Sequence, residues 1–136
     1  MAIHSGIIQA DADNYTITGT VIEGKKIGRE IGFPTANILT NADKPIPANG
    51  VYAVEVNTEF GSFQGMLSIG VNPTIDPANR KISIEVNIFD FDRDIYNKKI
   101  SIVFRKRLRD EIRFENIEQL AAQMKLDRKE ALNVLK

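Results

Sequence analysis

Oxygen-bearing side chains in the segment Gly32-Phe33-Pro34-Thr35-Ala36-Asn37 are the first candidates for chemistry in this chain. Pro34 biases the residue before it towards an extended backbone. In an extended segment Thr35 and Asn37, two positions apart, present their side chains on the same face. A hydroxyl and an amide carbonyl are hard, neutral ligands that suit Mg²⁺ bound to nucleotide phosphates. The ordinary alternative is a turn in which both side chains bond their own backbone, and spacing alone favours that alternative.

A glycine-rich stretch with several cations precedes this segment. Glycine lets backbone N–H groups approach a ligand closely, and nearby cations suit phosphate. The spacing Gly19-x-x-x-x-Gly24-Lys25 approaches a P-loop, but Lys26 stands at the place of the required Ser or Thr and no helical pattern follows. The pattern alone favours a flexible hairpin with a solvated, charged tip over a phosphate-binding loop. The residues concerned are Gly19, Gly24, Lys25, Lys26, Gly28, Arg29 and Gly32.

One carboxylate, Glu85, lies in a run that alternates between apolar and polar residues. The apolar members are Ile82, Ile84, Val86 and Ile88, and Glu85 shares the other face with Ser83 and Asn87. A carboxylate that is fixed on a rigid strand and reaches a hydroxyl can act as a general base. A glutamate that simply faces solvent is the commoner case, and the run by itself favours it.

Composition excludes several other kinds of chemistry. The chain has 136 residues, no cysteine and a single histidine, His4, so thiol nucleophiles, zinc–thiolate sites and Ser-His triads lack their side chains. Lys plus Arg and Asp plus Glu each number 18, which gives no net charge and disfavours nucleic acid as a partner. No run approaches the roughly 18 apolar residues that span a bilayer. Without a signal-like segment, a cytoplasmic location is expected.

Hydrophobic periodicity predicts a mainly β domain with helices at its C-terminal end. Residues 1–14 are weakly patterned and are expected to be a lead-in or linker stub, and residues 15–136 form the domain. A period of two predicts strands over 15–22, 51–56, 63–69, 82–88 and 100–104. Asn116 is the expected N-cap of one helix, and Asp127, with Glu130 three residues on, is the expected N-cap of a second, short one. Strands followed by helices suggest a small antiparallel barrel with a helix packed on it.

Taken together and in order, these motifs resemble the riboflavin kinase family. The resemblance runs from Tyr15 to Leu135, and its most specific part is Pro-Thr-Ala-Asn at 34–37 after a glycine-rich lead, with Glu85 about fifty residues on. The other segments that carry it are Gly19-x-Val21-x-x-Gly24, Gly28-Arg29, Gly50-Val51-Tyr52-Ala53, Ile69-Gly70-x-Asn72-Pro73-Thr74, Ile84-Glu85-Val86, Ile95-Tyr96 and Leu108-Arg109-x-Glu111-x-x-Phe114.

The resemblance implies a six-stranded Greek-key barrel with a C-terminal helix, and transfer of the ATP γ-phosphoryl group to the 5′-hydroxyl of riboflavin, giving FMN and ADP. It implies that Thr35 and Asn37 hold Mg²⁺ and that Glu85 accepts the hydroxyl proton. The implied nucleotide-binding residues are Gly19, Gly24, Lys25, Gly28, Arg29, Gly32 and Pro34. The implied flavin-binding residues are Asn72, Tyr96, Arg109, Glu111 and Phe114.

The sequence departs from the family pattern at three asparagines. Asn87 stands where many relatives have histidine, Asn97 where a glycine often follows the tyrosine, and Asn72 where an arginine is frequent. Bacterial relatives usually carry an N-terminal FMN adenylyltransferase domain. The unpatterned first fourteen residues favour a module excised from such an enzyme over a free-standing kinase. A barrel that binds flavin or nucleotide without turnover is the main alternative; an oligonucleotide-binding barrel is disfavoured, since no aromatic stacking strip is evident.

Overall fold

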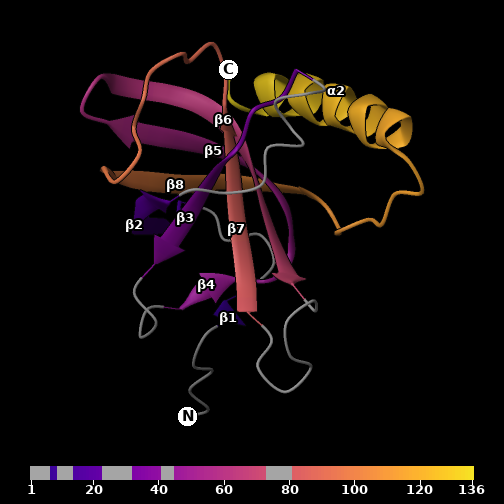
Figure 1. Cartoon of the computed structure of the whole chain (residues 1–136), viewed down its shortest axis with the longest axis horizontal. Helices are drawn as coiled ribbons and strands as arrows, with labels where there is room; N and C mark the ends of the chain where they lie inside the picture. The colour runs from indigo at the N-terminus through magenta and orange to yellow at the C-terminus, as the bar shows by residue number, and fades with distance from the viewer. Residues whose placement is uncertain (1–6, 9–13, 23–31, 41–44, 73–80) are drawn as a thin grey trace.

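In the computed structural model, a closed β-barrel with the helix α2 on its outer side forms the body of the described residues (Figure 1). The structure describes residues 7–8, 14–22, 32–40, 45–72 and 81–136, the side chains of 7, 8, 71, 72 and 81 excepted. The elements are β1 (Ile7–Ile8), β2 (Thr16–Ile22), β3 (Ala36–Thr40), β4 (Ile46–Pro47), β5 (Gly50–Thr58), β6 (Gly61–Asn72), β7 (Lys81–Ile88), β8 (Lys99–Arg109) and α2 (Ile117–Val134).

The barrel strands follow the order β2-β3-β7-β6-β5-β8, and β8 closes the ring on β2. All six neighbouring pairs are antiparallel. Strands β5, β6 and β7 are successive neighbours, and β8 returns to lie beside β5, which is the Greek-key arrangement. The predicted fold is therefore confirmed. Outside the barrel, β1 pairs in parallel with β4, so the predicted lead-in contributes a short strand, and a domain boundary at Tyr15 stays a prediction.

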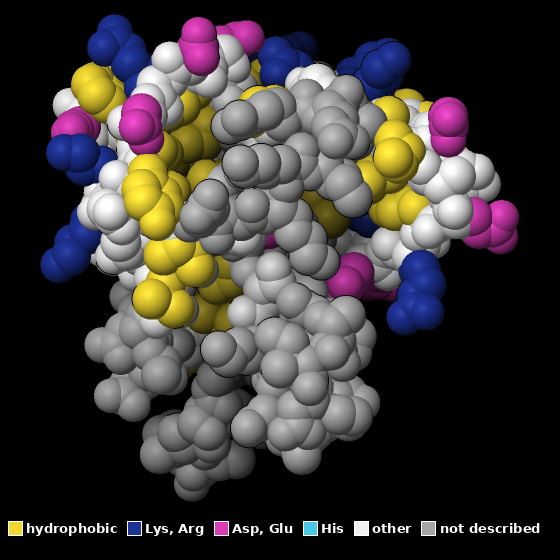
Figure 2. All heavy atoms as spheres, viewed as in Figure 1, with side chains coloured by type: hydrophobic (Ala, Val, Ile, Leu, Met, Phe, Trp, Pro, Cys, Tyr) yellow, Lys and Arg dark blue, Asp and Glu magenta, His cyan; other side chains and the backbone are white. Residues whose placement is uncertain are grey.

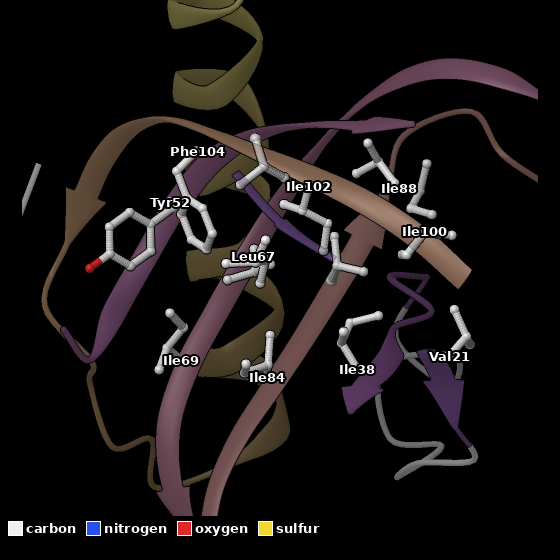
Figure 3. Packing of buried hydrophobic residues seen from close by; sticks show 14 of the residues in the cluster. Val21, Ile38, Tyr52, Leu67, Ile69, Ile84, Ile88, Ile100, Ile102 and Phe104 are labelled. Carbon is white, nitrogen blue, oxygen red and sulfur yellow. The ribbon is translucent and has the colours of Figure 1, made fainter. Parts of the chain in front are cut away.

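Alternating side chains from every barrel strand fill the interior. Figure 3 shows Tyr52 of β5, Leu67 of β6 and Phe104 of β8 pointing toward one another. The rings of Tyr52 and Phe104 meet edge to face, with centroids 5.1 Å apart and planes at 88°, a favoured aromatic geometry. Because these side chains are fully buried and occupy the centre, a ligand has to bind on the outside of the wall.

The outer wall of the barrel is partly covered by α2, which packs on β5, β6 and β8. A second apolar cluster lies at this contact and includes Ala53, Met66 and, from the helix, Ala131. Asn116 is the N-cap as predicted: its Oδ1 accepts from the backbone N–H of Gln119 at 2.8 Å. The predicted second helix is wrong, because α2 runs without a break through Asp127, whose carboxylate bonds side chains instead of capping backbone.

Two further details refine the sequence-based picture. In β7, Ile84, Val86 and Ile88 are buried as expected, but Ile82, near the strand end, is 50% exposed. Asn97 has a φ of 65°, a left-handed conformation that glycine and asparagine tolerate best, which explains how it can stand at a place where glycine is frequent.

Among the described helices, none is long and apolar enough to cross a membrane.

Charged side chains of both signs are spread over the surface. On the face shown in Figure 2, Lys and Arg side chains are interspersed with Asp and Glu side chains around the rim. This mixture agrees with the zero formal net charge of the sequence. A surface of this kind differs from the one-sign stripe that marks a nucleic-acid groove.

Candidate active site

Strand register places a row of candidate residues across the outer wall. Asn37 of β3 lies opposite Glu85 of β7, and Glu85 lies opposite Ser68 of β6. Ser68 in turn lies opposite Val51 of β5, and Val51 opposite Arg109 of β8. Directly opposite residues point to the same face of a sheet. Residues that are far apart in sequence are thus aligned from the predicted metal ligands at one end to the predicted flavin segment at the other.

A cleft of about 420 Å³ lies over part of this row. Small-molecule sites typically occupy several hundred Å³, so the cleft has the size of a substrate site. Its walls come from the outer face of the barrel, from α2 and from the segment that joins β8 to α2, which we call the strap (residues 110–116). The lining residues are Thr35, Val51, Met66, Leu67, Ser68, Glu85, Asn87, Arg109, Glu111, Ile112, Phe114, Leu120, Met124 and Asp127.

Glu85 and Thr35, fifty residues apart in sequence, meet in this cleft. The Thr35 hydroxyl donates to Glu85 Oε1 at 3.2 Å, and both residues are partly buried. The alternation of β7 correctly assigned Glu85 to the face opposite the core row. Residues of the helix and of the strap line the same cleft, and Glu85 is only partly exposed. A half-buried carboxylate within reach of hydroxyl groups is suited to accept a proton.

The donor set beside Glu85 fits a hard divalent cation. Asn37 Oδ1 is buried and has no hydrogen-bond partner, which is costly unless a ligand satisfies it. With the Thr35 hydroxyl it supplies neutral oxygen donors of the kind that Mg²⁺ accepts when waters and phosphates complete its shell. Within the described part of the chain, no group of three or more His, Cys, Asp or Glu side chains could form a cage for a metal ion. The residues therefore fit a metal that arrives with a nucleotide.

Asn87 was predicted to share the strand face of Glu85 and was noted as a departure from the family, but it was not among the predicted site residues; the structure places it in the cleft. Its side chain is 5% exposed, and its Nδ2 donates to the carbonyl oxygen of Pro34 at 2.7 Å. This bond holds the backbone immediately before Thr35. Asn87 Oδ1 is buried without a partner. Its place two residues after Glu85, on the same strand face, was the available signal.

The predicted flavin residues are brought together in part. Arg109, Glu111 and Phe114 line the cleft, and the Arg109 guanidinium lies 5.9 Å from the centre of the Phe114 ring. Tyr96 is 50% exposed and does not line the cleft. Asn72 pairs with Lys81 at the end of β6, and its side chain is outside the described part.

The predicted nucleotide residues lie mostly outside the described residues, namely Gly24, Lys25, Gly28 and Arg29. Of the others, Gly19 allows β2 and β3 to approach closely, because a Cβ there would collide with the Ile38 side chain and lie 2.9 Å from the Leu39 carbonyl oxygen. Gly32 has a φ of +86° with open space around it. Pro34 is exposed and offers its carbonyl to Asn87. Their roles toward a nucleotide stay predictions.

Comparison with known proteins agrees with this geometry. The flavokinase family model, described as riboflavin kinase, matches residues 12–135. The chain belongs to the riboflavin kinase family. Bifunctional riboflavin kinase/FMN adenylyltransferases from Bacillus subtilis and Listeria monocytogenes are 42% and 47% identical over 119 and 113 residues. These matches cover 87% and 83% of this chain but 38% and 36% of the relatives, so the chain spans well under half of their length.

Solved structures also resemble the barrel of this riboflavin kinase family member. A Streptococcus pneumoniae protein described as a macrolide-efflux protein superposes with a TM-score of 0.80 at 36% identity, covering 87% of this chain and 38% of that one. Riboflavin kinase from Trypanosoma brucei superposes with a TM-score of 0.61 at 21% identity, covering 88% and 78%. At that lower identity the second likeness concerns the fold alone.

Proposed function

We propose that this chain is a riboflavin kinase module that transfers the γ-phosphoryl group of ATP to the 5′-hydroxyl of riboflavin, giving FMN and ADP. The observation that carries the proposal is the hydrogen bond between Thr35 and Glu85 inside a substrate-sized cleft, with Asn37 opposite Glu85 in the adjacent strand. Phosphoryl transfer asks mainly for positioning and charge neutralisation. These residues would position the hydroxyl and a Mg²⁺ ion, and the ion would supply the neutralising charge.

Each residue has a defined part in the reaction. Glu85 accepts the proton of the attacking 5′-hydroxyl as the oxygen–phosphorus bond forms, while the bond between the γ-phosphorus and the ADP oxygen breaks. Thr35 and Asn37 would hold Mg²⁺, which neutralises phosphate charge when bound. The flavin ring is proposed to lie toward Arg109, Glu111 and Phe114. Residues of the strap and of α2 line the acceptor side of the cleft.

Conversion of riboflavin and Mg-ATP to FMN, followed by chromatography, tests this function. Glu85→Gln keeps the size of the side chain and an oxygen that can accept from Thr35, but it removes the base. General-base catalysis contributes roughly 10²–10⁴-fold, so we expect kcat to fall by about that factor while riboflavin affinity stays within about twofold. Glu55→Gln is the matched control, because Glu55 pairs with Arg105 at 2.9 Å outside the cleft. Equal kcat in wild type and Glu85→Gln would remove Glu85 as the base.

Flavin that stays bound without any FMN being formed would instead identify a non-catalytic binding module. The bifunctional relatives, of which the match covers 38% and 36%, support a further proposal. In it, the module works beside an FMN adenylyltransferase domain in a longer protein, in the cytoplasm. The chain alone is then expected to make FMN but no FAD from riboflavin and ATP. FAD formation by the isolated chain would contradict this division of labour.

A further inference from the structure

Asp127 is a charged residue on the face of α2 that packs on the barrel. Leu120, Met124, Asp127 and Ala131 follow one another at intervals of three or four, so they share one face of the helix. Asp127 is 3% exposed, and Leu120, Met124 and Ala131 on this face are apolar, with Gln123 as the polar neighbour one turn earlier. A buried carboxylate is costly unless it is paired and hydrogen-bonded. The Asp127 carboxylate therefore needs a hydrogen-bonded, oppositely charged partner, and its place on a buried face suggests a role other than packing.

The partner is Arg109, the last residue of β8. Arg109 Nε donates to Asp127 Oδ1 at 2.8 Å and Nη2 donates to Oδ2 at 2.7 Å, a bidentate pair. Gln123, one turn earlier in the helix, donates to Oδ1 at 2.9 Å. The Arg109 side chain is 17% exposed. Fork geometry of this kind fixes the plane of the guanidinium group as well as its position.

Stability alone gives a weak reason for this pair. Buried ion pairs can often be replaced by well-packed apolar residues at little or no cost, and a leucine at 127 would continue the apolar face of the helix. The pair does settle where the guanidinium points. Arg109 Nη1 donates to the Asp110 carbonyl at 2.9 Å, which leaves further N–H donors on a group that lines the cleft.

The pair also fixes the start of the strap. The strap leaves the barrel at Arg109, and its Glu111 carboxylate lies against Gly70 of β6. Phe114, further along, lies under the Arg109 guanidinium. Phe114 is thus in contact with the arginine, and Glu111 follows it by two residues at the start of the strap. Asp127 holds that arginine from the helix side.

We infer that Asp127 is a positioning residue for the flavin side of the cleft, acting through Arg109. The inference rests on the proposed function. In it, the N–H donors of Arg109 that bond no described residue meet acceptor atoms of the ligand, such as the carbonyl oxygens of the flavin ring. Asp127 acts through Arg109 in this inference, whereas the sequence pattern predicted it to be a helix N-cap.

Asp127→Asn tests the inference, because the amide has the same shape as the carboxylate. One of the two oxygens that accept from Arg109 becomes an NH₂ group, which is a donor and so faces a donor of the guanidinium. Hydrogen bonds to charged groups are worth more than about 1.4 kcal/mol, which is tenfold in affinity. We expect the riboflavin Kd, measured by flavin fluorescence, and the riboflavin KM to rise by about tenfold or more. The ATP KM is expected to stay within about twofold, and kcat at saturating riboflavin within about threefold.

Two further variants separate positioning from mere folding. Glu55→Gln breaks the ion pair that Glu55 makes with Arg105 of β8, away from the cleft, and should leave the riboflavin Kd unchanged. Arg109→Lys keeps the charge without the fork, so it should reproduce the Asp127→Asn effect, and the double variant should be no worse than either single one. A riboflavin Kd within about twofold of wild type in folded Asp127→Asn, or effects that multiply in the double variant, would overturn the inference.

The same measurements distinguish this inference from the proposed function. If the wild-type chain binds riboflavin but forms no FMN, the kinase proposal fails, while the Kd ratios still decide the role of Asp127. If FMN is formed and Asp127→Asn lowers only the melting temperature, the kinase proposal stands and the inference fails. If the wild type binds no riboflavin, both fail.

Discussion

Gly70 of β6 is the position where a single methyl group should separate ligand binding from stability. A Cβ at Gly70 would lie 2.5 Å from Glu111 Oε1 and 2.9 Å from its Cδ. Carbon atoms need roughly 3.5 Å, so the carboxylate must retreat by about 1 Å. The obstacle is the end of a flexible, exposed side chain, and the strand loses a glycine, so we expect the free energy of unfolding to change by less than about 1 kcal/mol.

The cost of Gly70→Ala should appear in ligand binding. If Glu111 contributes one charge-assisted hydrogen bond to the flavin, its displacement loses about 1.5–3 kcal/mol, or roughly 10- to 100-fold in riboflavin Kd. Fluorescence titration with riboflavin measures this loss, and urea unfolding measures stability. Unchanged affinity in Gly70→Ala would show that Glu111 is not part of the flavin site.

Gly65, on the same strand, is the matched contrast. A Cβ there would lie 2.6 Å from the backbone carbonyl oxygen of Asn87, which cannot turn aside as a side chain can. Overpacking of this kind costs about 1–3 kcal/mol, so Gly65→Ala should lower the free energy of unfolding clearly more than Gly70→Ala. Equal destabilisation by the two substitutions would refute the reasoning from these contacts.

The remaining predictions concern the metal ligands, the core and alkaline pH. Thr35→Ala and Asn37→Ala should each raise the Mg²⁺ concentration for half-maximal FMN formation by about tenfold or more; an unchanged Mg²⁺ dependence in both would contradict their role. Phe104→Ala should lower the free energy of unfolding by about 3–5 kcal/mol in urea titrations, whereas Phe60→Ala, at a 43% exposed position, should cost under about 1 kcal/mol. Burial raises the pKa of the Tyr15 hydroxyl in the folded state. The stabilising contribution of the neutral hydroxyl is therefore complete below the ordinary pKa near 10 and is lost as pH rises through the pKa of the folded state. The difference in unfolding free energy between wild type and Tyr15→Phe should shrink above about pH 10, and a difference that grows instead would contradict the assignment.

Local pattern predicted five of the six barrel strands, because the barrel interior is apolar and the strands alternate; β3 was not among the predicted strands. Alternation in β7 assigned Glu85 and Asn87 to the outer face, and both lie there. Periodicity contains no information on what covers an outer face, so it favoured a solvent-facing glutamate. The contact between Thr35 and Glu85 depends on the pairing of β3 with β7, which spacing within either segment cannot reveal. The family resemblance supplied that link.

Asp127 shows how a correct local signal can fail. Asp followed by Glu three residues later is a capping signature, and it is present at 127–130. The helix nevertheless continues through it, because the carboxylate gains two hydrogen bonds from Arg109 and the backbone N–H groups keep their partners within the helix. Tertiary pairing with a residue eighteen positions earlier outweighs the local preference. The sequence of the helix alone does not indicate that Arg109 is the partner of Asp127.

The barrel keeps its packing and its chemistry on opposite faces of the same strands. In β6, Leu67 and Ile69 point into the core, whereas Met66 and Ser68 point to the cleft. Because successive side chains of a strand point to opposite faces, neighbouring positions have different requirements. The inward side chain must fill volume in the core, and the outward one can contact a ligand. Rigid core packing thus holds the outer row of polar side chains in register without contributing a ligand itself. Substitutions inside should therefore lower stability with little change in KM, and substitutions one residue away should do the reverse.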